Sequence, residues 1–439
     1  MLESIGNIFK IPELKKRLLF SFGALGVYRL GVHVPTAGIN SEALKSYFEG
    51  QQGTIFNFVD MFSGGAFSQF TVFSLGIMPY ISASIILQLL TVVWPTLERL
   101  AKEGEHGRKK ITQYTRRGTI ALAAIQALGI SLGLEAMQAP GGQAIVLSPG
   151  WGFRLMTTVT LMTGTAFLMW LGEQISERGI GNGISLLIFA GIVASLPQAL
   201  VMTYDQLSHG VMAPLTAALI AVVAVVVTAG TVLMQQAQRR IPVQYAKRVV
   251  GRRMMGGQST HIPLRINTAG VIPVIFASSI IMLPVTAVSF LSETQFVWLQ
   301  TFVNDNLRPG ALLYSSVYVA AIVFFCYFYT AIIFNPMDLA DNMKKYGGFI
   351  PGIRAGKRTA EYIDKVLTRI TLAGAIFLAA IAVLPEILIV YVNVPFYFGG
   401  TALLIVVGVG LDTVQQIESH LVMRHYETLL KRRRIGSRR

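Results

Sequence analysis

TVFSLGIMPYISASIILQLLTVV, residues 71–93, is a long stretch without one charged side chain. A helix needs about 20 mostly apolar residues to cross the hydrocarbon core of a membrane, and this stretch is long enough. Nine other stretches are comparably long and apolar: 18–35, 118–137, 154–173, 183–203, 213–235, 270–290, 312–334, 369–391 and 398–417. The chain is 53% hydrophobic and 13% charged, whereas soluble domains carry roughly 25% charged residues. We therefore predict an all-α polytopic membrane protein with ten transmembrane helices.

The basic residues are distributed unevenly between the two sides of the membrane. Ten spans place both termini on the same side. All but four of the 37 Lys and Arg residues fall on that side, in the termini and in alternate loops. The exceptions are Arg29, Lys45, Arg154 and Arg308. Because basic loops remain in the cytoplasm, we predict a multi-pass protein with both termini cytoplasmic.

The spans divide the chain into two halves of five. Residues 1–203 form the N-terminal half, 204–212 an external linker and 213–417 the C-terminal half, before a basic cytoplasmic tail at 418–439. An odd number of spans in each half makes the second half enter the membrane in the opposite sense to the first. This parity permits an inverted repeat, as in many transport proteins, although no internal sequence similarity accompanies it.

Two of the predicted cytoplasmic loops, 236–269 and 335–369, are longer than orientation requires. The first contains seven basic residues and no acidic one. Its IPVQYAKRVV and HIPLRI segments predict two extended arms, interrupted by Gly251, Gly256 and Gly257. A basic hairpin of this kind could bind rRNA phosphates or an acidic protein face. Composition alone leaves docking and simple topology control equally open.

Residues 53–70, GTIFNFVDMFSGGAFSQF, are rich in aromatic side chains but too polar for a membrane span. The residues alone favour an interfacial helix on the outer surface, with its aromatic rings among the lipid headgroups. The alternative is a re-entrant segment, which a membrane permits only where protein or a water-filled cavity surrounds it.

The chain lacks the residue patterns of an enzyme. Its six histidines show no metal-ligand spacing, and it has no Walker A motif, paired carboxylates or nucleophile constellation. Several spans also have no charged residue at their centres, which argues against an ion-coupled transporter. We expect no cofactor, no metal site and no catalytic residue.

Seven long stretches resemble the SecY family, the central subunit of the bacterial protein-conducting channel. They are SLGIMPYISASIILQLLTVVWP (74–95), KEGEHGRKKITQYTR (102–116), ERGIGNGISLLIFAGIV (177–193), RRIPVQYAKR (239–248), INTAGVIPVIFASSII (266–281), YGGFIPGIR (346–354) and GGTALLIVVGVGLD (399–412). The resemblance covers almost the whole chain in order.

The resemblance implies two pseudo-symmetric five-helix halves around a central hourglass pore in the bacterial plasma membrane. Unfolded secretory chains would pass along the pore, and transmembrane segments would leave sideways between the second and seventh spans. The chain would not be an enzyme, because its partners hydrolyse ATP or GTP. A small-solute transporter and a non-conducting membrane scaffold are the alternatives; the first lacks midplane ionisable groups, and the second does not need such large basic loops.

The resemblance also implies roles for particular residues. A pore ring of isoleucine side chains is expected from Ile81, Ile85, Ile184, Ile188, Ile275 and Ile405. A short re-entrant plug helix at about 54–66 is expected below the ring, with Ile55, Phe58 and Phe62 for apolar contact, Asn57 and Asp60 for polarity, and Gly64 and Gly65 as a flexible joint.

The two long cytoplasmic loops dock the ribosome and the SecA motor ATPase in this family. Arg252, Arg253 and Arg354 are the expected docking residues, since the planar guanidinium donates two hydrogen bonds at once to phosphate or carboxylate. Expected partners are small SecE-like and SecG-like membrane subunits, SecA, the ribosome with its rRNA, signal sequences and nascent chains. YidC-like insertases and SecDF-like accessory proteins are further expected partners.

Overall fold

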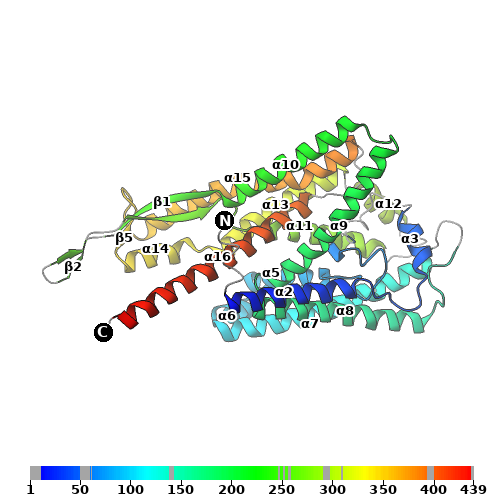
Figure 1. Ribbon diagram of the computed structural model, residues 1–439, viewed down its shortest axis with the longest axis horizontal. Coiled ribbons are helices and arrows are strands. Elements are labelled where there is room, and N and C mark those ends of the chain that lie inside the picture. The colour runs from blue at the N-terminus through cyan, green and yellow to red at the C-terminus, as the bar shows by residue number, and fades with distance from the viewer. Residues whose placement is uncertain are drawn as a thin grey trace.

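The helices that carry the ten predicted spans lie side by side along the long axis of the molecule (Figure 1). The computed structural model describes residues 11–49, 60, 62–137, 143–245, 248–250, 253–255, 259–289, 297–307, 310–392 and 400–436. In chain order the span helices are α2 (Pro12–Gly31), α5 (Met78–Val93), α7 (Glu105–Ala136), α8 (Trp151–Arg178), α9 (Gly183–Ser208), α10 (Pro214–Gln236), α11 (Ile272–Ser289), α13 (Leu312–Ile333), α15 (Lys357–Val392) and α16 (Gly400–Gly436).

Local sequence explains where several of these helices begin. Pro12 and Pro214 open α2 and α10, and Pro79 lies in the first turn of α5. Proline suits this position because its φ is already helical and its missing N–H has no partner there. Helix α9 instead begins after Asn182, whose side chain accepts hydrogen bonds from the backbone N–H groups of Ile184 and Ser185 at 3.1 and 3.4 Å.

Seven of the described helices are long and apolar enough to cross a membrane on their own. An eighth span is counted when α5 is joined to α6 (Pro95–Lys102), which bends away from it by 98°. Helix α2 carries Lys15, Lys16 and Arg17, and the described apolar part of α11 is short. Both nevertheless coincide with predicted spans, so the described helices agree with the ten-span prediction without establishing the count.

The helices pack in two groups. In the first, α7 packs against α5 and α8, and α2 packs against α8 and α9. In the second, α13 packs against α11 and α15, and α16 packs against α10 and α15. The groups meet where α5 contacts α11 and where α9 contacts α16 and α10. The second and seventh predicted spans are therefore direct neighbours.

Several helices continue beyond the predicted membrane boundaries. The predicted 94–117 loop is helical in α6 and the first turns of α7, α9 runs to Ser208 into the predicted 204–212 linker, and α16 continues through the tail to Gly436. Hydropathy detects the apolar part of a helix, whereas Lys, Arg, Glu and Gln are also good helix formers and carry the backbone on into water. The apolar stretches therefore locate these helices but not their ends; α5, by contrast, begins only at Met78, inside the predicted 71–93 span.

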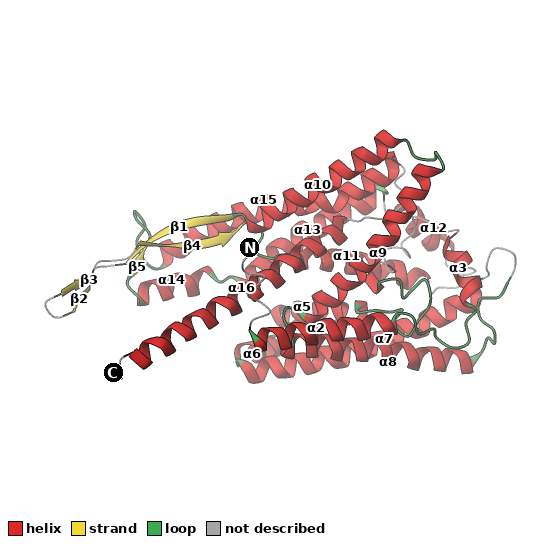
Figure 2. Ribbon diagram, viewed as in Figure 1, coloured by secondary structure: helices red, strands yellow, loops and turns green. Residues whose placement is uncertain are grey.

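A small sheet projects from one end of the helices. Strand β1 (Gln238–Tyr245) pairs antiparallel with β4 (Ser259–Arg265), Ile241 lying opposite Ile262, and with β5 (Gly348–Phe349) on its other side. Beyond them β2 (Arg248–Val250) pairs with β3 (Arg253–Met255). Figure 2 shows the strands, α14 (Pro336–Lys345) and the last turns of α16 gathered at this end, which we call the hairpin end. The predicted extended arms are confirmed as β1 and β4.

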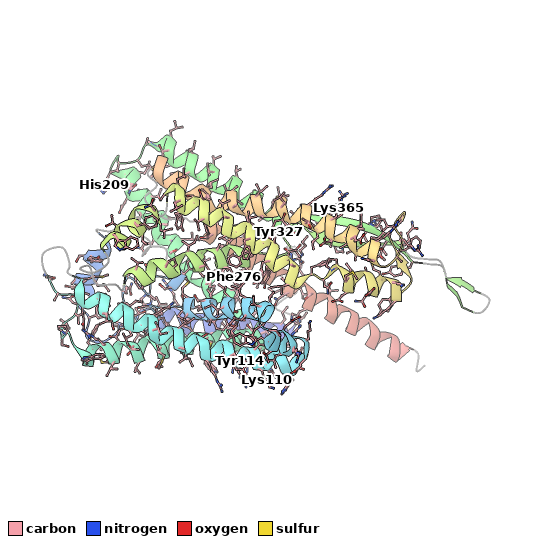
Figure 3. All side chains as sticks on the ribbon, turned by 180° about the vertical axis from the view of Figure 1, so that it is seen from behind. Lys110, Tyr114, His209, Phe276, Tyr327 and Lys365 are labelled. Atoms are coloured by element: carbon pink, nitrogen blue, oxygen red, sulfur yellow. The ribbon has the colours of Figure 1, made fainter. Side chains whose placement is uncertain are left out.

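The opposite end, called the far end, carries α3 (Ser41–Glu49) and α12 (Val297–Asn306) (Figure 1). His209, between α9 and α10, also lies toward this end, away from Lys365 on α15 (Figure 3). The largest hydrophobic cluster occupies the middle of the molecule. There Phe276 of α11, labelled in Figure 3, packs edge-on against Phe325 and Tyr329 of α13 with ring centroids 5.8 and 6.0 Å apart.

Candidate pore seal, plug segment and docking surface

Isoleucine side chains from four helices belong to the central hydrophobic cluster. Four of them are buried and two are partly buried against the cluster. They are Ile81 and Ile85 of α5, Ile184 and Ile188 of α9, Ile275 of α11 and Ile405 of α16. Within α5 and α9 the pairs are four residues apart and so share one helix face. All six predicted ring residues thus belong to the same extended cluster, and the ring itself stays a prediction.

Glycine allows these helices to approach closely enough to form the cluster. A Cβ atom at Gly408 of α16 would overlap the side chain of Val271, immediately before α11. Likewise, a Cβ at Gly183, the first residue of α9, would overlap the carbonyl of Gly172 in α8. Small residues at helix interfaces give membrane helices the van der Waals contact that drives their association.

The end of the predicted plug lies against the same cluster. Phe62 and Ala66, 5% and 0% exposed, belong to it together with the isoleucine side chains. Three other predicted plug residues lie outside the described residues: Ile55, Asn57 and Phe58. The described part of the segment therefore makes the apolar contact expected of Phe62.

The polar side chains in this segment stabilise its own turn. The carboxylate of Asp60 accepts a hydrogen bond from the backbone N–H of Ser68 at 2.8 Å. The hydroxyl of Ser63 donates to the Asp60 carbonyl at 3.0 Å and accepts from the Phe67 N–H at 3.1 Å. Asp60, expected only to make the segment polar, therefore also helps to close a compact turn with residues 62–68.

Gly64 and Gly65 both adopt positive φ angles, 69° and 87°. Such angles favour glycine because a Cβ atom is strained there. Their surroundings differ: a Cβ at Gly65 would meet nothing within 4 Å, whereas one at Gly64 would lie 2.8 Å from the Gly191 Cα in α9. Gly64 is therefore a site of close packing as well as a turn residue, which the prediction of a flexible joint did not foresee.

The two predicted docking loops form one packed unit at the hairpin end. The inward faces of β1 and β4 meet α14 and the start of α15 in a separate hydrophobic cluster, made by Ile241, Val243, Leu264, Met343, Ile350 and Ile363. The burial pattern of β1 alternates in its second half, as expected for a strand with one face covered. This alternation in IPVQY was the available sequence signal that the loop is anchored.

The predicted docking arginines lie at different places in the chain. Arg354 is exposed in the turn between β5 and α15, and its backbone carbonyl accepts a 3.0 Å hydrogen bond from the Thr359 hydroxyl. Arg253 is the first residue of β3, toward the tip of the hairpin. Arg252 lies outside the described residues. Arg354 therefore presents its side chain to solvent.

Two neighbouring glutamines on α16 link parts of the chain that the sequence did not connect. The Gln415 side-chain oxygen accepts a 2.8 Å hydrogen bond from Arg265, at the end of β4. The Gln416 side-chain oxygen accepts one of 2.9 Å from the backbone N–H of Gly181, just before α9. Helix α16 therefore joins the base of the hairpin to the N-terminal group of helices. No sequence motif marks these long-range contacts.

Metal-binding clusters are absent from the described part of the chain, where no group of three or more His, Cys, Asp or Glu side chains could hold an ion. Cys326 is buried as a free thiol within α13.

Long apolar helices packed around a buried hydrophobic cluster define a polytopic membrane protein. The family model described as SecY matches residues 71–414. The SecY protein translocase subunit of Escherichia coli K12 is 54% identical over 96% of this chain and 95% of its own length. The chain belongs to the SecY family; it is a channel subunit of a protein translocase and is not itself an enzyme.

Solved structures share the fold at low sequence identity. One is a SecY protein whose plug domain stabilises the closed state of the translocation channel and maintains a membrane seal. It aligns with a TM-score of 0.66 at 20% identity, covering 95% of this chain and 97% of that one. Another is Sec61 in the canine ribosome–channel complex from the endoplasmic reticulum, with a TM-score of 0.65, 19% identity and the same coverage.

Proposed function

We propose that the chain conducts unfolded secretory polypeptides across the bacterial plasma membrane, with both termini in the cytoplasm, and releases transmembrane segments sideways. The exit would lie between α5 and α11, because these helices belong to different packing groups and yet are direct neighbours. The observation that supports the proposal is that the six predicted ring residues, from four helices, lie in one hydrophobic cluster that also contains Phe62 of the predicted plug.

An isoleucine ring suits a pore that must pass a polypeptide and hold back ions. A narrow apolar constriction loses its water and offers an ion no replacement for its hydration shell. Isoleucine is stiff at χ1, which favours a constriction of fixed bore. The seated plug segment would seal the ring at rest and leave it when a chain arrives.

The hairpin end would receive the partners that deliver polypeptides. It carries the packed strand unit, exposed Arg354 and the basic tail, which suit rRNA phosphates or an acidic protein face. We propose the ribosome and a SecA-like motor as these partners, with SecE-like and SecG-like subunits alongside the helices. A Sec61 relative forms a ribosome–channel complex, which supports the ribosome among them.

Site-specific crosslinking tests the route of the polypeptide. Single cysteines would replace Ile81, Ile275 and, as a control, Ile125 of α7, which is 68% exposed and not among the core residues. A precursor arrested in transit should crosslink to the first two positions and not to the third. Failure at both ring positions, with an arrested precursor present, would refute the channel route.

The same experiment separates the alternatives. A small-solute transporter or a non-conducting scaffold predicts no precursor crosslinks at Ile81 or Ile275 beyond the level at Ile125. Vesicles that contain the complex should also import a motor-driven precursor in proportion to those crosslinks.

A further inference from the structure

Two adjacent side chains at the far end of α2 hold the plug segment by its backbone. The Tyr28 hydroxyl donates a hydrogen bond to the Ser63 carbonyl at 3.0 Å. The Arg29 guanidinium donates to the next carbonyl, that of Gly64, at 2.7 Å. Both bonds join parts of the chain 35 residues apart. They therefore fix the position of the plug segment relative to α2.

These bonds lie where water competes poorly. Tyr28 and Ser63 are each 2% exposed, and Arg29 is half-buried. A hydrogen bond from a charged donor is shorter and stronger than a neutral one, in keeping with the short Arg29 contact. Since an unpaired buried carbonyl is costly, the two donors also satisfy groups that would otherwise oppose seating of the segment.

The contact also depends on close approach of a third element. The Tyr28 hydroxyl would lie 2.9 Å from a Cβ at Gly64 and 3.2 Å from one at Gly191. Only glycine at both positions lets α9, the plug turn and the Tyr28 hydroxyl meet at one point. The plug turn also presents the Ser63 and Gly64 carbonyls in fixed directions, because hydrogen bonds made by Asp60 and Ser63 close it internally.

We propose that Tyr28 and Arg29 are positioning residues that latch the plug segment in its seated position, an inference that rests on the proposed sealing role of that segment. A donor pair on α2 then adds to the free-energy difference between the sealed and unsealed channel. For the segment to leave, an arriving polypeptide must break these two bonds.

The latch predicts graded effects on the resting channel. Tyr28→Phe removes one neutral hydrogen bond and should raise the resting ion conductance about threefold to fivefold. Arg29→Met removes the charged donor and should raise it by roughly tenfold or more. Arg29→Lys keeps a cationic donor and should restore part of the seal. A residue that matters only for folding would not give this order.

The measurement uses the full chain with its co-purified subunits in planar bilayers, without substrate. Arg17→Met is the matched control, because Arg17 lies on the same helix and also donates to a backbone carbonyl, that of Gly179, at 3.4 Å. Deletion of residues 57–65 gives the conductance of a channel without a plug. The amount of assembled complex in each membrane preparation checks folding.

A second readout follows exposure of the plug segment directly. Ala66→Cys would be introduced as a common background, since Ala66 is fully buried and the single native thiol, Cys326, is 2% exposed. A membrane-impermeant maleimide added on the outer side should label this position faster in Tyr28→Phe and Arg29→Met, because labelling follows the population of the open state.

The outcomes are distinct. Higher conductance and faster labelling in the two α2 variants, but not in Arg17→Met, support the latch. Wild-type values in both variants, while the plug deletion raises conductance, would overturn the latch and leave the plug in place. Wild-type conductance in the deletion itself would overturn the plug, and the latch with it.

Discussion

Single residues in the plug segment have to satisfy two demands. Phe62 and Ala66 bury apolar surface in the central cluster, while Asp60 and Ser63 satisfy backbone groups within the turn. A segment without these polar side chains would leave N–H and C=O groups unpaired in an apolar setting. The mixed composition of residues 62–70 therefore suits a piece of chain that folds on itself and rests on an apolar surface.

Gly64 and Gly65 allow the turn and the packing to be tested separately. Both have positive φ, so alanine at either position costs about 1–2 kcal/mol in backbone strain. Only Gly64→Ala also places a Cβ against Gly191, which adds about 1–3 kcal/mol of overpacking. We expect Gly64→Ala to raise the resting conductance more than Gly65→Ala. Equal effects would show that contact with α9 does not hold the segment.

Whole elements pack together at the hairpin end: β1, β4, α14 and the start of α15 form the unit proposed for docking, which we call the docking unit. Strands β1 and β4 gain one covered face from α14 and α15, which stabilises a hairpin that would be marginal in isolation. The base of the hairpin is thereby fixed to the helices, and strand β2 lies beyond their end (Figure 1).

A substitution at Ile363 tests whether the packed base stabilises the hairpin. It is fully buried in the docking unit, so Ile363→Ala should destabilise that unit by about 2–5 kcal/mol through lost contact and a residual cavity. Ile376→Ala on the same helix is the control, because Ile376 is 58% exposed. Limited proteolysis within 236–269 should be faster in the first variant alone. Equal cleavage rates in the two would mean that the base is not the stabilising contact.

Sequence could predict the elements better than the contacts between them. All ten predicted spans coincide with helices, because apolar length is a local property that hydropathy reads directly. The extensions of α7 and α16 into charged sequence escaped it, since helix propensity rather than apolarity continues them. The Gln415 and Gln416 bonds reach residues 150 and 235 positions away, and nothing local to a glutamine indicates such a partner.

In the candidate site, too, sequence predicted which residues are involved better than it predicted their contacts. The isoleucine residues were placed by resemblance, and the structure brings all six into one cluster. The bonds from Tyr28 and Arg29 to the plug carbonyls were not predictable, because the acceptors are backbone groups that carry no sequence signal. Arg29 had been noted only as a basic residue outside the cytoplasmic set.

At the scale of the whole molecule, α16 connects the docking unit to the pore. Its N-terminal part contributes Ile405 to the central cluster, and further along Gln415 binds the base of the hairpin. Gln416 binds the backbone just before α9, in the other group of helices. One continuous helix therefore contacts the base of the hairpin, the central hydrophobic cluster and both groups of helices.

Charge reversal at the hairpin end tests whether docking occurs at a point or over a diffuse basic surface. Arg354→Glu places a carboxylate in the exposed turn between β5 and α15, whereas Arg358→Glu makes the same change in charge at an exposed position one helical turn away. If a motor partner docks through the bidentate guanidinium of Arg354, the first variant should reduce motor-driven export about tenfold or more, and the second should have a much smaller effect. Membrane insertion of ribosome-delivered segments should fall less than export in the first variant. An equal loss of export in the two variants would indicate general electrostatic attraction. An equal loss of export and insertion in the first variant would contradict a motor-specific contact at Arg354, and the amount of assembled complex would show whether misfolding is the cause.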